Sequence, residues 1–171
     1  AGATVVRWDA HPAFLEGLQR MHGTKAVDFA LLAQDDRVVL FELKDFRDHG
    51  IENRGRLRGG ELAREVADKV RDTLAGMTWA CNRPHADAEV TKVTSGFFRR
   101  DTSPLLVVLW LDRDDVAQAA EAATLQTAIA AHLRPHIHAK VIVTSLRLRD
   151  RALPHRQYGW HEARSLPRMH A

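Results

Sequence analysis

Two short runs of the chain decide its fold, the stretch AVDFALL at residues 26–32 and the stretch RVVLFELKD at residues 37–45. Both runs are rich in valine, leucine and phenylalanine, which favour strands. Gln34-Asp35-Asp36 between them supplies residues that are typical of a turn. The sequence therefore predicts two strands, Lys25–Leu32 and Arg37–Lys44, that pair as a β-hairpin.

Charged residues interrupt the apolar pattern at one end of this hairpin. Alternation along the second strand places Glu42 and Lys44 on the same face as Val38 and Leu40. Burying charged groups beside an apolar surface is costly unless something pairs with them. Asp28 would lie on the neighbouring strand near the same end. We therefore expect two carboxylates and an ammonium group to meet at the rim of the sheet.

This combination of groups suits the hydrolysis of phosphodiester bonds. The carboxylates of Asp28 and Glu42 are hard oxygen ligands of the kind that Mg²⁺ or Mn²⁺ prefers. The backbone carbonyl of Leu43 would complete the set of metal ligands. A bound cation polarises the phosphate and lowers the pKa of a bound water. Lys44 would orient that water or stabilise negative charge on the reacting phosphate.

The pattern Asp28…Glu42-Leu43-Lys44 resembles the motif of the PD-(D/E)XK nuclease superfamily, which contains many restriction, repair and recombination nucleases. The resemblance implies a restriction-endonuclease-like core in the order α-β-β-β-α-β. It also implies a divalent-metal-dependent nuclease with Asp28, Glu42 and Lys44 as catalytic residues, and it favours DNA as the substrate.

The resemblance covers roughly Asp9 to Met77 and is incomplete in two respects. Val27 precedes the aspartate where the motif has proline. A first core strand before Asp28 is also missing, unless Thr4–Trp8 supplies it.

Two further site residues are carried over from the resemblance. Glu16 stands where many members place a glutamate near the metal on their first helix, but a plain solvent-exposed glutamate fits the sequence as well. Lys69 stands where the helix after the E-x-K strand often supplies a basic side chain. The alternative for Lys69 is an ordinary helical ion pair with Glu65.

Periodicity predicts the remaining elements. We expect helices from Asp9 or His11 to Gly23, over Glu61–Met77, and over Val116–Leu133 with Asp114 or Asp115 as its cap, and strands at Leu105–Leu111 and Lys140–Leu148. The segment Asn82–Pro104 reads either as short strands at Ala88–Thr94 and Gly96–Arg99 or as a long loop.

These elements predict an α/β fold, a mixed central sheet with helices packed on its faces. The 171 residues read as a single domain, with an irregular C-terminal tail at 149–171.

Arginine is concentrated in two stretches, although the formal net charge is only +3. The clusters are Arg47, Arg54, Arg56 and Arg58, and Arg147, Arg149, Arg151 and Arg156. Guanidinium groups pair well with phosphate oxygens, so these clusters favour nucleic acid as the partner, with a solvated surface loop as the alternative for each. Sequence specificity would then require loops, a homodimer or a partner subunit.

Other classes of protein receive less support. The single cysteine, Cys81, excludes an internal disulfide and a multi-cysteine zinc site. His132, His136 and His138 leave a zinc hydrolase as a weaker reading, and a non-catalytic nucleic-acid-binding or assembly module remains the main alternative to a nuclease. The chain lacks a secretory signal and any apolar run long enough to span a bilayer, so we expect a cytoplasmic protein.

Overall fold

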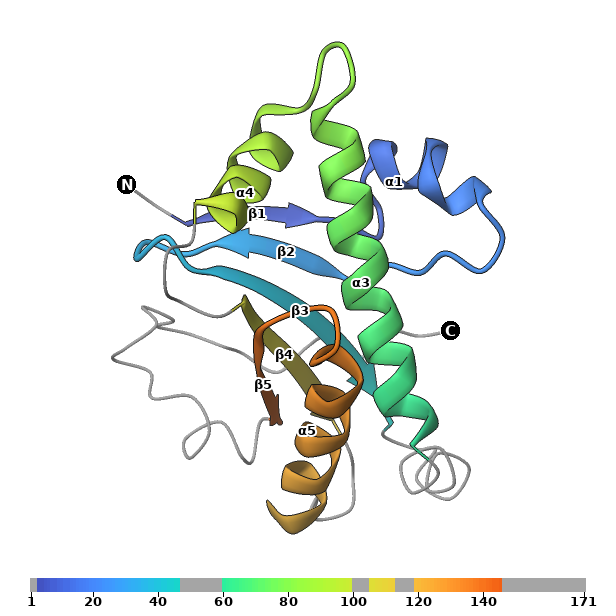
Figure 1. Ribbon diagram of the computed structural model, residues 1–171, viewed down its shortest axis with the longest axis vertical. Helices are drawn as coiled ribbons and strands as arrows, with labels where there is room; N and C mark the ends of the chain where they lie inside the picture. The colour runs from blue at the N-terminus through green and yellow to red at the C-terminus, as the bar shows by residue number, and fades with distance from the viewer. Residues whose placement is uncertain (1–2, 47–59, 100–104, 113–118, 146–171) are drawn as a thin grey trace.

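The computed structural model describes residues 3–46, 60–99, 105–112 and 119–145 (Figure 1). Its centre is a five-stranded mixed sheet in the order β1-β2-β3-β4-β5. The strands are β1 (Thr4–Arg7), β2 (Phe29–Leu32), β3 (Val38–Asp45), β4 (Leu105–Asp112) and β5 (Ala139–Thr144). The helices are α1 (Pro12–Glu16), α3 (Glu61–Cys81), α4 (Ala88–Phe98) and α5 (Ala119–Leu133), with a 3₁₀ turn η1 at Leu18–Arg20. The predicted α/β class with a mixed sheet is confirmed at this level.

The predicted hairpin is present as β2 and β3. The two strands are antiparallel, with Ala30 opposite Leu40, and they are joined by a turn in which the Ala33 N–H donates to the Arg37 carbonyl at 2.8 Å. The first strand is shorter than expected, because regular pairing begins at Phe29 rather than at Lys25. On the other side, β1 pairs antiparallel with β2, so a strand does form within the segment Thr4–Trp8.

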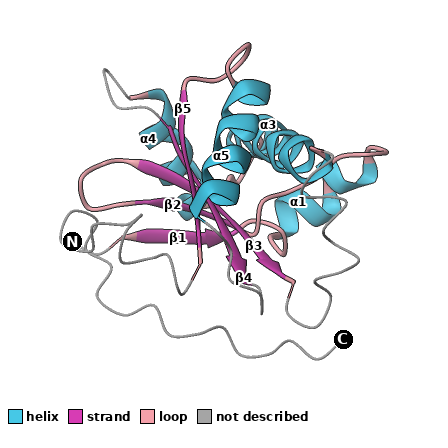
Figure 2. Cartoon of the chain, turned by 90° about the horizontal axis from the view of Figure 1, so that it is seen from below, coloured by secondary structure: helices cyan, strands magenta, loops and turns pink. Residues whose placement is uncertain are grey.

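All described helices pack on one face of the sheet, which corrects the expectation that helices cover both faces (Figure 2). The chain moves from β3 to β4 and then from β4 to β5, each time in a parallel pairing and in the same direction across the sheet. Because such crossovers are almost always right-handed, both connections place their helices on the same side.

The central strand β4 is buried along its whole length, as its continuous apolar sequence predicts. Its residues Leu105, Val107 and Leu109 face the helices and belong to the main core. Leu106 and Val108 point to the opposite face, where they form a smaller apolar cluster with residues of β3 and β5.

The predicted first helix is divided. His11 caps α1 by accepting a hydrogen bond at Nδ1 from the Ala13 N–H at 3.2 Å, but the helix ends at Glu16. At Gly17 the ring of Trp79 lies so close that a Cβ atom would be only 2.4 Å away. Met21, inside the predicted range of this helix, is 64% exposed and does not belong to the core.

The segment Asn82–Pro104, predicted as strands or a loop, contains the helix α4 instead. Asp87 caps it, because its Oδ1 accepts hydrogen bonds from Glu89 and Val90 at 2.8 and 3.0 Å. The helix buries Val90 and Val93 against β1 and β2. Its valine and threonine residues are weak helix formers, so local propensity favoured strands here. The tertiary contacts stabilise the helix instead.

The remaining element boundaries differ from the predicted ones by a few residues, and some predictions fall outside the described residues. Helix α3 continues past Met77 to Cys81, and β5 begins at Ala139. The proposed caps Asp114 and Asp115, the tail at 149–171 and both arginine clusters lie outside the described residues. None of the described helices has the length and apolar character needed to cross a membrane.

Candidate active site

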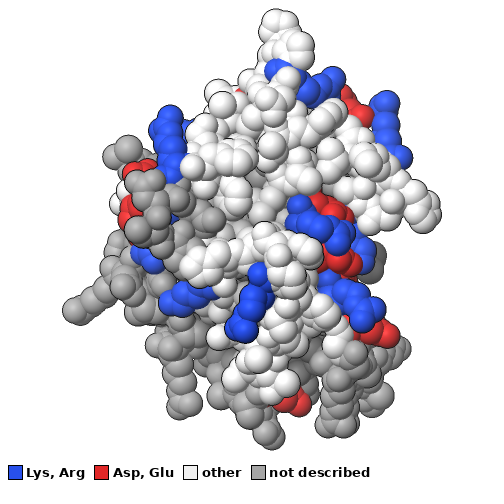
Figure 3. Space-filling view, viewed as in Figure 1, with Lys and Arg blue, Asp and Glu red and all other residues white. Residues whose placement is uncertain are grey.

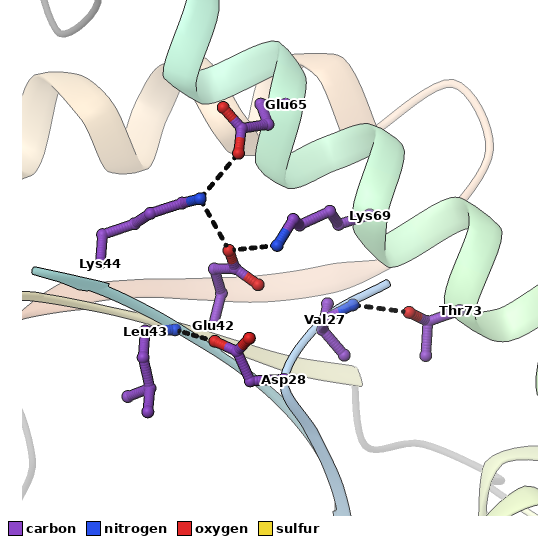
Figure 4. Close-up of polar contacts among 8 residues, drawn as sticks. All are labelled: Val27, Asp28, Glu42, Leu43, Lys44, Glu65, Lys69 and Thr73. Carbon is purple, nitrogen blue, oxygen red and sulfur yellow. Dashed lines mark hydrogen bonds and ion pairs between the residues drawn. The ribbon is translucent and has the colours of Figure 1, made fainter. Parts of the chain in front are cut away.

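Strand β3 carries Glu42 and Lys44 onto the face that lies beneath α3 (Figure 4). The alternation predicted from the sequence is confirmed, because Val38 and Leu40 point to the same side and join the main core. Glu42 is only 1% exposed, so its carboxyl group is enclosed by the sheet and the helix.

An alternating chain of charges joins β3 to α3. The Lys69 ammonium group donates to Glu42 Oε1 at 2.6 Å, and Lys44 Nζ lies 3.2 Å from the same oxygen. Lys44 also donates to Glu65 Oε1 at 2.7 Å. Lys69 therefore faces the site and is paired with Glu42, a different partner from the Glu65 that helical spacing suggests.

Asp28 completes the convergence that the sequence predicts. It stands directly before β2, where its carbonyl accepts a hydrogen bond from the Trp8 N–H at 2.9 Å. Its Oδ2 accepts a hydrogen bond from the Leu43 N–H at 2.6 Å, which holds the carboxylate against β3 beside Glu42 (Figure 4). Two carboxylates and the ammonium group of Lys44 thus meet at one end of the hairpin.

Two hydrogen bonds from the backbone of the segment before β2 fix the position of Asp28. The buried Oγ1 of Thr73 accepts a hydrogen bond from the Val27 N–H at 3.0 Å. Asp72 Oδ2 accepts one from the Lys25 N–H, also at 3.0 Å. Both acceptors belong to α3, so this helix positions Asp28 as well as the ion pairs of β3.

Burial raises the pKa of the Asp28 carboxyl group above its usual value, and the negative charge of Asp9 raises it further. The hydrogen bond from Leu43 and the positive charges of Lys69 and Lys44 only partly oppose this change. Burial also raises the pKa of Glu42, and the neighbouring charge of Asp28 adds to the effect. Two carboxylates whose ionised forms are both disfavoured therefore share the site, and a cation would relieve that cost.

The pKa of Lys44 is affected in the opposite sense by burial and by its partners. Burial lowers this pKa, but the hydrogen bond to Glu65 and the attraction of Glu42 and Glu65 more than offset it, so the net pKa is raised. The ammonium group therefore stays protonated at neutral pH.

One oxygen of the site lacks a partner. Glu42 Oε2 is buried and accepts no hydrogen bond from any described residue. An unsatisfied buried polar atom costs about 1–3 kcal/mol, so each one calls for a physical explanation. Trp8 Nε1 is the other such atom among the described residues. A buried carboxylate oxygen of this kind, beside a second carboxylate, fits the oxygen ligands of Mg²⁺ or Mn²⁺. The residues present therefore suit a hard divalent cation.

The described residues contain no group of three or more His, Cys, Asp or Glu side chains arranged to hold a metal ion. The predicted ligand set consists of Asp28, Glu42 and the carbonyl of Leu43, with Glu16 as a further candidate; without Glu16 it has only two such side chains. His132, His136 and His138 follow one another around the end of α5 and are exposed.

The remaining predicted residues are not brought to the site by any described contact. Glu16 is exposed at the end of α1, and within the described part of the chain its side chain makes no hydrogen bond or ion pair. Arg47, Arg54, Arg56 and Arg58 lie outside the described residues.

Sequence reasoning missed the roles of Glu65 and Thr73. With Lys69, these residues recur every four positions along α3, a spacing that places them on one face of a helix. That spacing was a usable signal, although it does not reveal which strand residues they meet.

Comparison with known proteins identifies no relative. No family model matches the chain, and neither the curated proteins nor the solved structures contain a significant match. The interpretation of the site therefore depends on its own residues.

Proposed function

We propose that this protein is a divalent-metal-dependent nuclease of the PD-(D/E)XK type that hydrolyses phosphodiester bonds. In this proposal Asp28 and Glu42 hold Mg²⁺ or Mn²⁺, together with the Leu43 carbonyl, and Lys44 acts at the reacting phosphate. The observation that carries the proposal is the buried carboxylate of Glu42, whose Oε2 has no described partner while Asp28 and Lys44 lie beside it.

The topology is compatible with this proposal. Three antiparallel strands, β1, β2 and β3, are followed by α3 and α4 and then by β4, which is parallel to β3. This order is similar to the β-β-β-α-β part of the core that the superfamily uses, with α4 as an additional helix before β4. The helix α1 departs from it, because it lies between β1 and β2 rather than before the first strand.

The cation would supply a polarised phosphate and a bound water of lowered pKa. Lys44 is protonated and is held between Glu42 and Glu65, so it cannot take a proton from water at neutral pH. Its ammonium group instead suits the stabilisation of negative charge that develops on the phosphate. Asp28 is fixed by the Leu43 N–H, so the two carboxylates keep their relative position without rearrangement.

DNA is the proposed substrate because of the resemblance in the motif, and nucleic-acid binding is assigned to Lys69 and to the arginines of 47–58. On the face shown in Figure 3, the described lysines and arginines are dispersed among acidic and uncharged residues. The described residues on that face form no continuous basic surface. Contacts with the nucleic-acid backbone are therefore assigned to the site itself and to the arginine-rich stretch.

Cleavage assays test the proposal directly. Circular and linear DNA, single- and double-stranded, should be cut in the presence of Mn²⁺ and left intact in EDTA. Lys44→Met should slow cleavage by about 10²–10³-fold, because it removes one stabilising group from the transition state. Circular dichroism should show that the fold is unchanged. Lys92→Met, on the exposed face of α4, is the matched control and should cut at the wild-type rate.

Two results would contradict the proposal. A Lys44→Met protein that cuts as fast as the wild type would remove Lys44 from the reaction. A wild-type protein that neither cuts nucleic acid nor binds Mn²⁺ through Asp28 and Glu42 would favour a non-catalytic binding or assembly module.

A further inference from the structure

Glu42 Oε1 is shared by two ammonium groups that are held very differently. Lys44 lies 3.2 Å from this oxygen and donates to Glu65 at 2.7 Å, so it has a second carboxylate as an anchor. Lys69 lies 2.6 Å from Glu42 Oε1, and Glu42 is the only described carboxylate within ion-pair distance of it, although Lys69 also attracts the nearby charge of Asp28. Lys69 would therefore lose its place if another cation took over this carboxylate, whereas Lys44 would keep Glu65.

The charges of the cluster point the same way. The carboxylates of Asp28 and Glu42 lie close together, and the ammonium groups of Lys44 and Lys69 offset their charge. A divalent cation bound to these two carboxylates would add two positive charges beside the ammonium groups. Repulsion between that cation and a nearby ammonium group is strong in a partly buried site. The long Lys69 side chain is 17% exposed, so it has a path toward solvent.

We propose that Lys69 is the resident counter-ion of the carboxylate pair, and that a divalent cation displaces its ammonium group from Glu42. This inference rests on the proposed function, because it assumes that Asp28 and Glu42 receive a cation. Lys69 then has two effects. It stabilises the buried carboxylate of Glu42 before the cation binds, and it weakens the binding of the cation by competing with it.

Calorimetric titration with Mn²⁺ tests the competition. Lys69→Gln removes the positive charge but keeps an N–H donor for Glu42, so the buried carboxylate retains a hydrogen-bond partner. This variant should bind Mn²⁺ about tenfold more tightly than the wild type, which corresponds to about 1.4 kcal/mol. Lys69→Arg keeps the charge and should bind Mn²⁺ about as the wild type does. Lys92→Gln on α4 is the matched control and should leave the affinity unchanged.

Thermal unfolding gives a readout that is independent of cleavage. Without Mn²⁺, Lys69→Gln should melt at a lower temperature than the wild type, because Glu42 has lost a counter-ion. With Mn²⁺ it should show the larger increase in melting temperature. If the variant binds Mn²⁺ no more tightly than the wild type, Lys69 does not compete and the inference is overturned.

A measurement on the wild-type protein covers the case in which the variant does not fold. In NMR spectra of protein with ¹³C-labelled lysine, Mg²⁺ should shift the Lys69 side-chain signal toward that of an exposed lysine and leave Lys44 in place. An unchanged Lys69 signal at saturating Mg²⁺ would overturn this inference and leave the proposed function in place. If the wild type shows no Mg²⁺ or Mn²⁺ binding that depends on Asp28, as tested with Asp28→Asn, both the inference and the proposed function fail.

Discussion

Glu42 places a carboxylate at a point of β3 where the sheet and α3 exclude water. Its neighbours Lys44 and Lys69 compensate the charge on Oε1, while Oε2 has no described partner and Asp28 adds a second negative charge nearby. For folding alone, an apolar residue at this position would avoid the cost of burying the charge. Buried, mutually repelling carboxylates with raised pKa values are found more often at functional sites than elsewhere.

The raised pKa of Glu42 predicts a particular dependence of stability on pH. Burial, reinforced by Asp28, raises this pKa in the folded protein above its unfolded value. The folded state then binds more protons between the two values, so the free energy of unfolding falls as the pH rises through that interval. Glu42→Gln, measured by urea denaturation at a series of pH values without divalent cations, should make this decrease smaller, and the raised pKa of Asp28 accounts for a remaining part of the same sign. A variant whose stability follows the wild-type curve would contradict the prediction.

Asp35 offers a contrast with the opposite sign. Its hydrogen bond with the Arg37 side chain lowers the pKa of Asp35 below its usual value. The stability that this pair contributes is present above the unfolded pKa and is lost as the pH falls through the folded pKa. Asp35→Asn should therefore change the curve only at more acidic pH, and by a small amount, because the pair is solvent-exposed.

The helix α3 is the element that assembles the site. One face of it meets β3 through Glu65 and Lys69, and one turn later Thr73 accepts the hydrogen bond from Val27. The same helix buries Leu62, Val66 and Val70 in the main core. Its packing against the sheet therefore sets the distance between the Asp28 segment and β3.

Replacing Thr73 should loosen this link. Thr73→Val keeps the shape of the side chain but leaves the buried Val27 N–H without an acceptor, which should lower the free energy of unfolding by about 1–3 kcal/mol. Thr73→Ser keeps the hydroxyl group and should lose less. Urea denaturation measures both effects.

Thr94 provides the matched control on α4. It is also buried, but its hydroxyl group donates to the Val90 carbonyl of its own helix. Thr94→Val removes a bond within one element and should change stability by less than Thr73→Val. Equal decreases in the free energy of unfolding for the two variants would show that the hydrogen bond between Thr73 and Val27 stabilises the fold no more than a bond within one helix.

At the scale of the whole molecule, β3, β4 and β5 lie side by side in chain order and parallel to one another. The described helices form a single layer over the sheet. The site lies between this layer and β3, at the boundary of the main core. Leu109 of β4 is fully buried beneath the helices, opposite Glu42 in the parallel pairing. The central strand thus supports the floor of the site.

Truncation at the centre and at the edge of the sheet should have very different effects. Leu109→Ala should lower the free energy of unfolding by about 2–5 kcal/mol, because it leaves a cavity in the main core. Val5→Ala, on the edge strand β1 where the side chain is 51% exposed, should change it by less than about 0.5 kcal/mol. Chemical denaturation measures both, and losses of similar size would contradict the assigned core.

The hairpin, the helix α3 and the strand β4 could be predicted from the sequence, because the periods of strands and helices are local properties. For the same reason, the sequence determined that Glu42 and Lys44 share a face of β3. The helix α4 was missed, since its valine and threonine residues favour strands locally and only packing against β1 and β2 stabilises them as a helix.

Only the tertiary structure decided which charges meet. The sequence suggested a Glu65–Lys69 pair within α3, whereas the fold places Lys69 on Glu42 and Lys44 on Glu65. It also decided that Thr73 tethers Val27 and that the described helices share one face of the sheet. These contacts depend on the distance and orientation between two elements. The packing of the whole core sets both, and no local sequence pattern does.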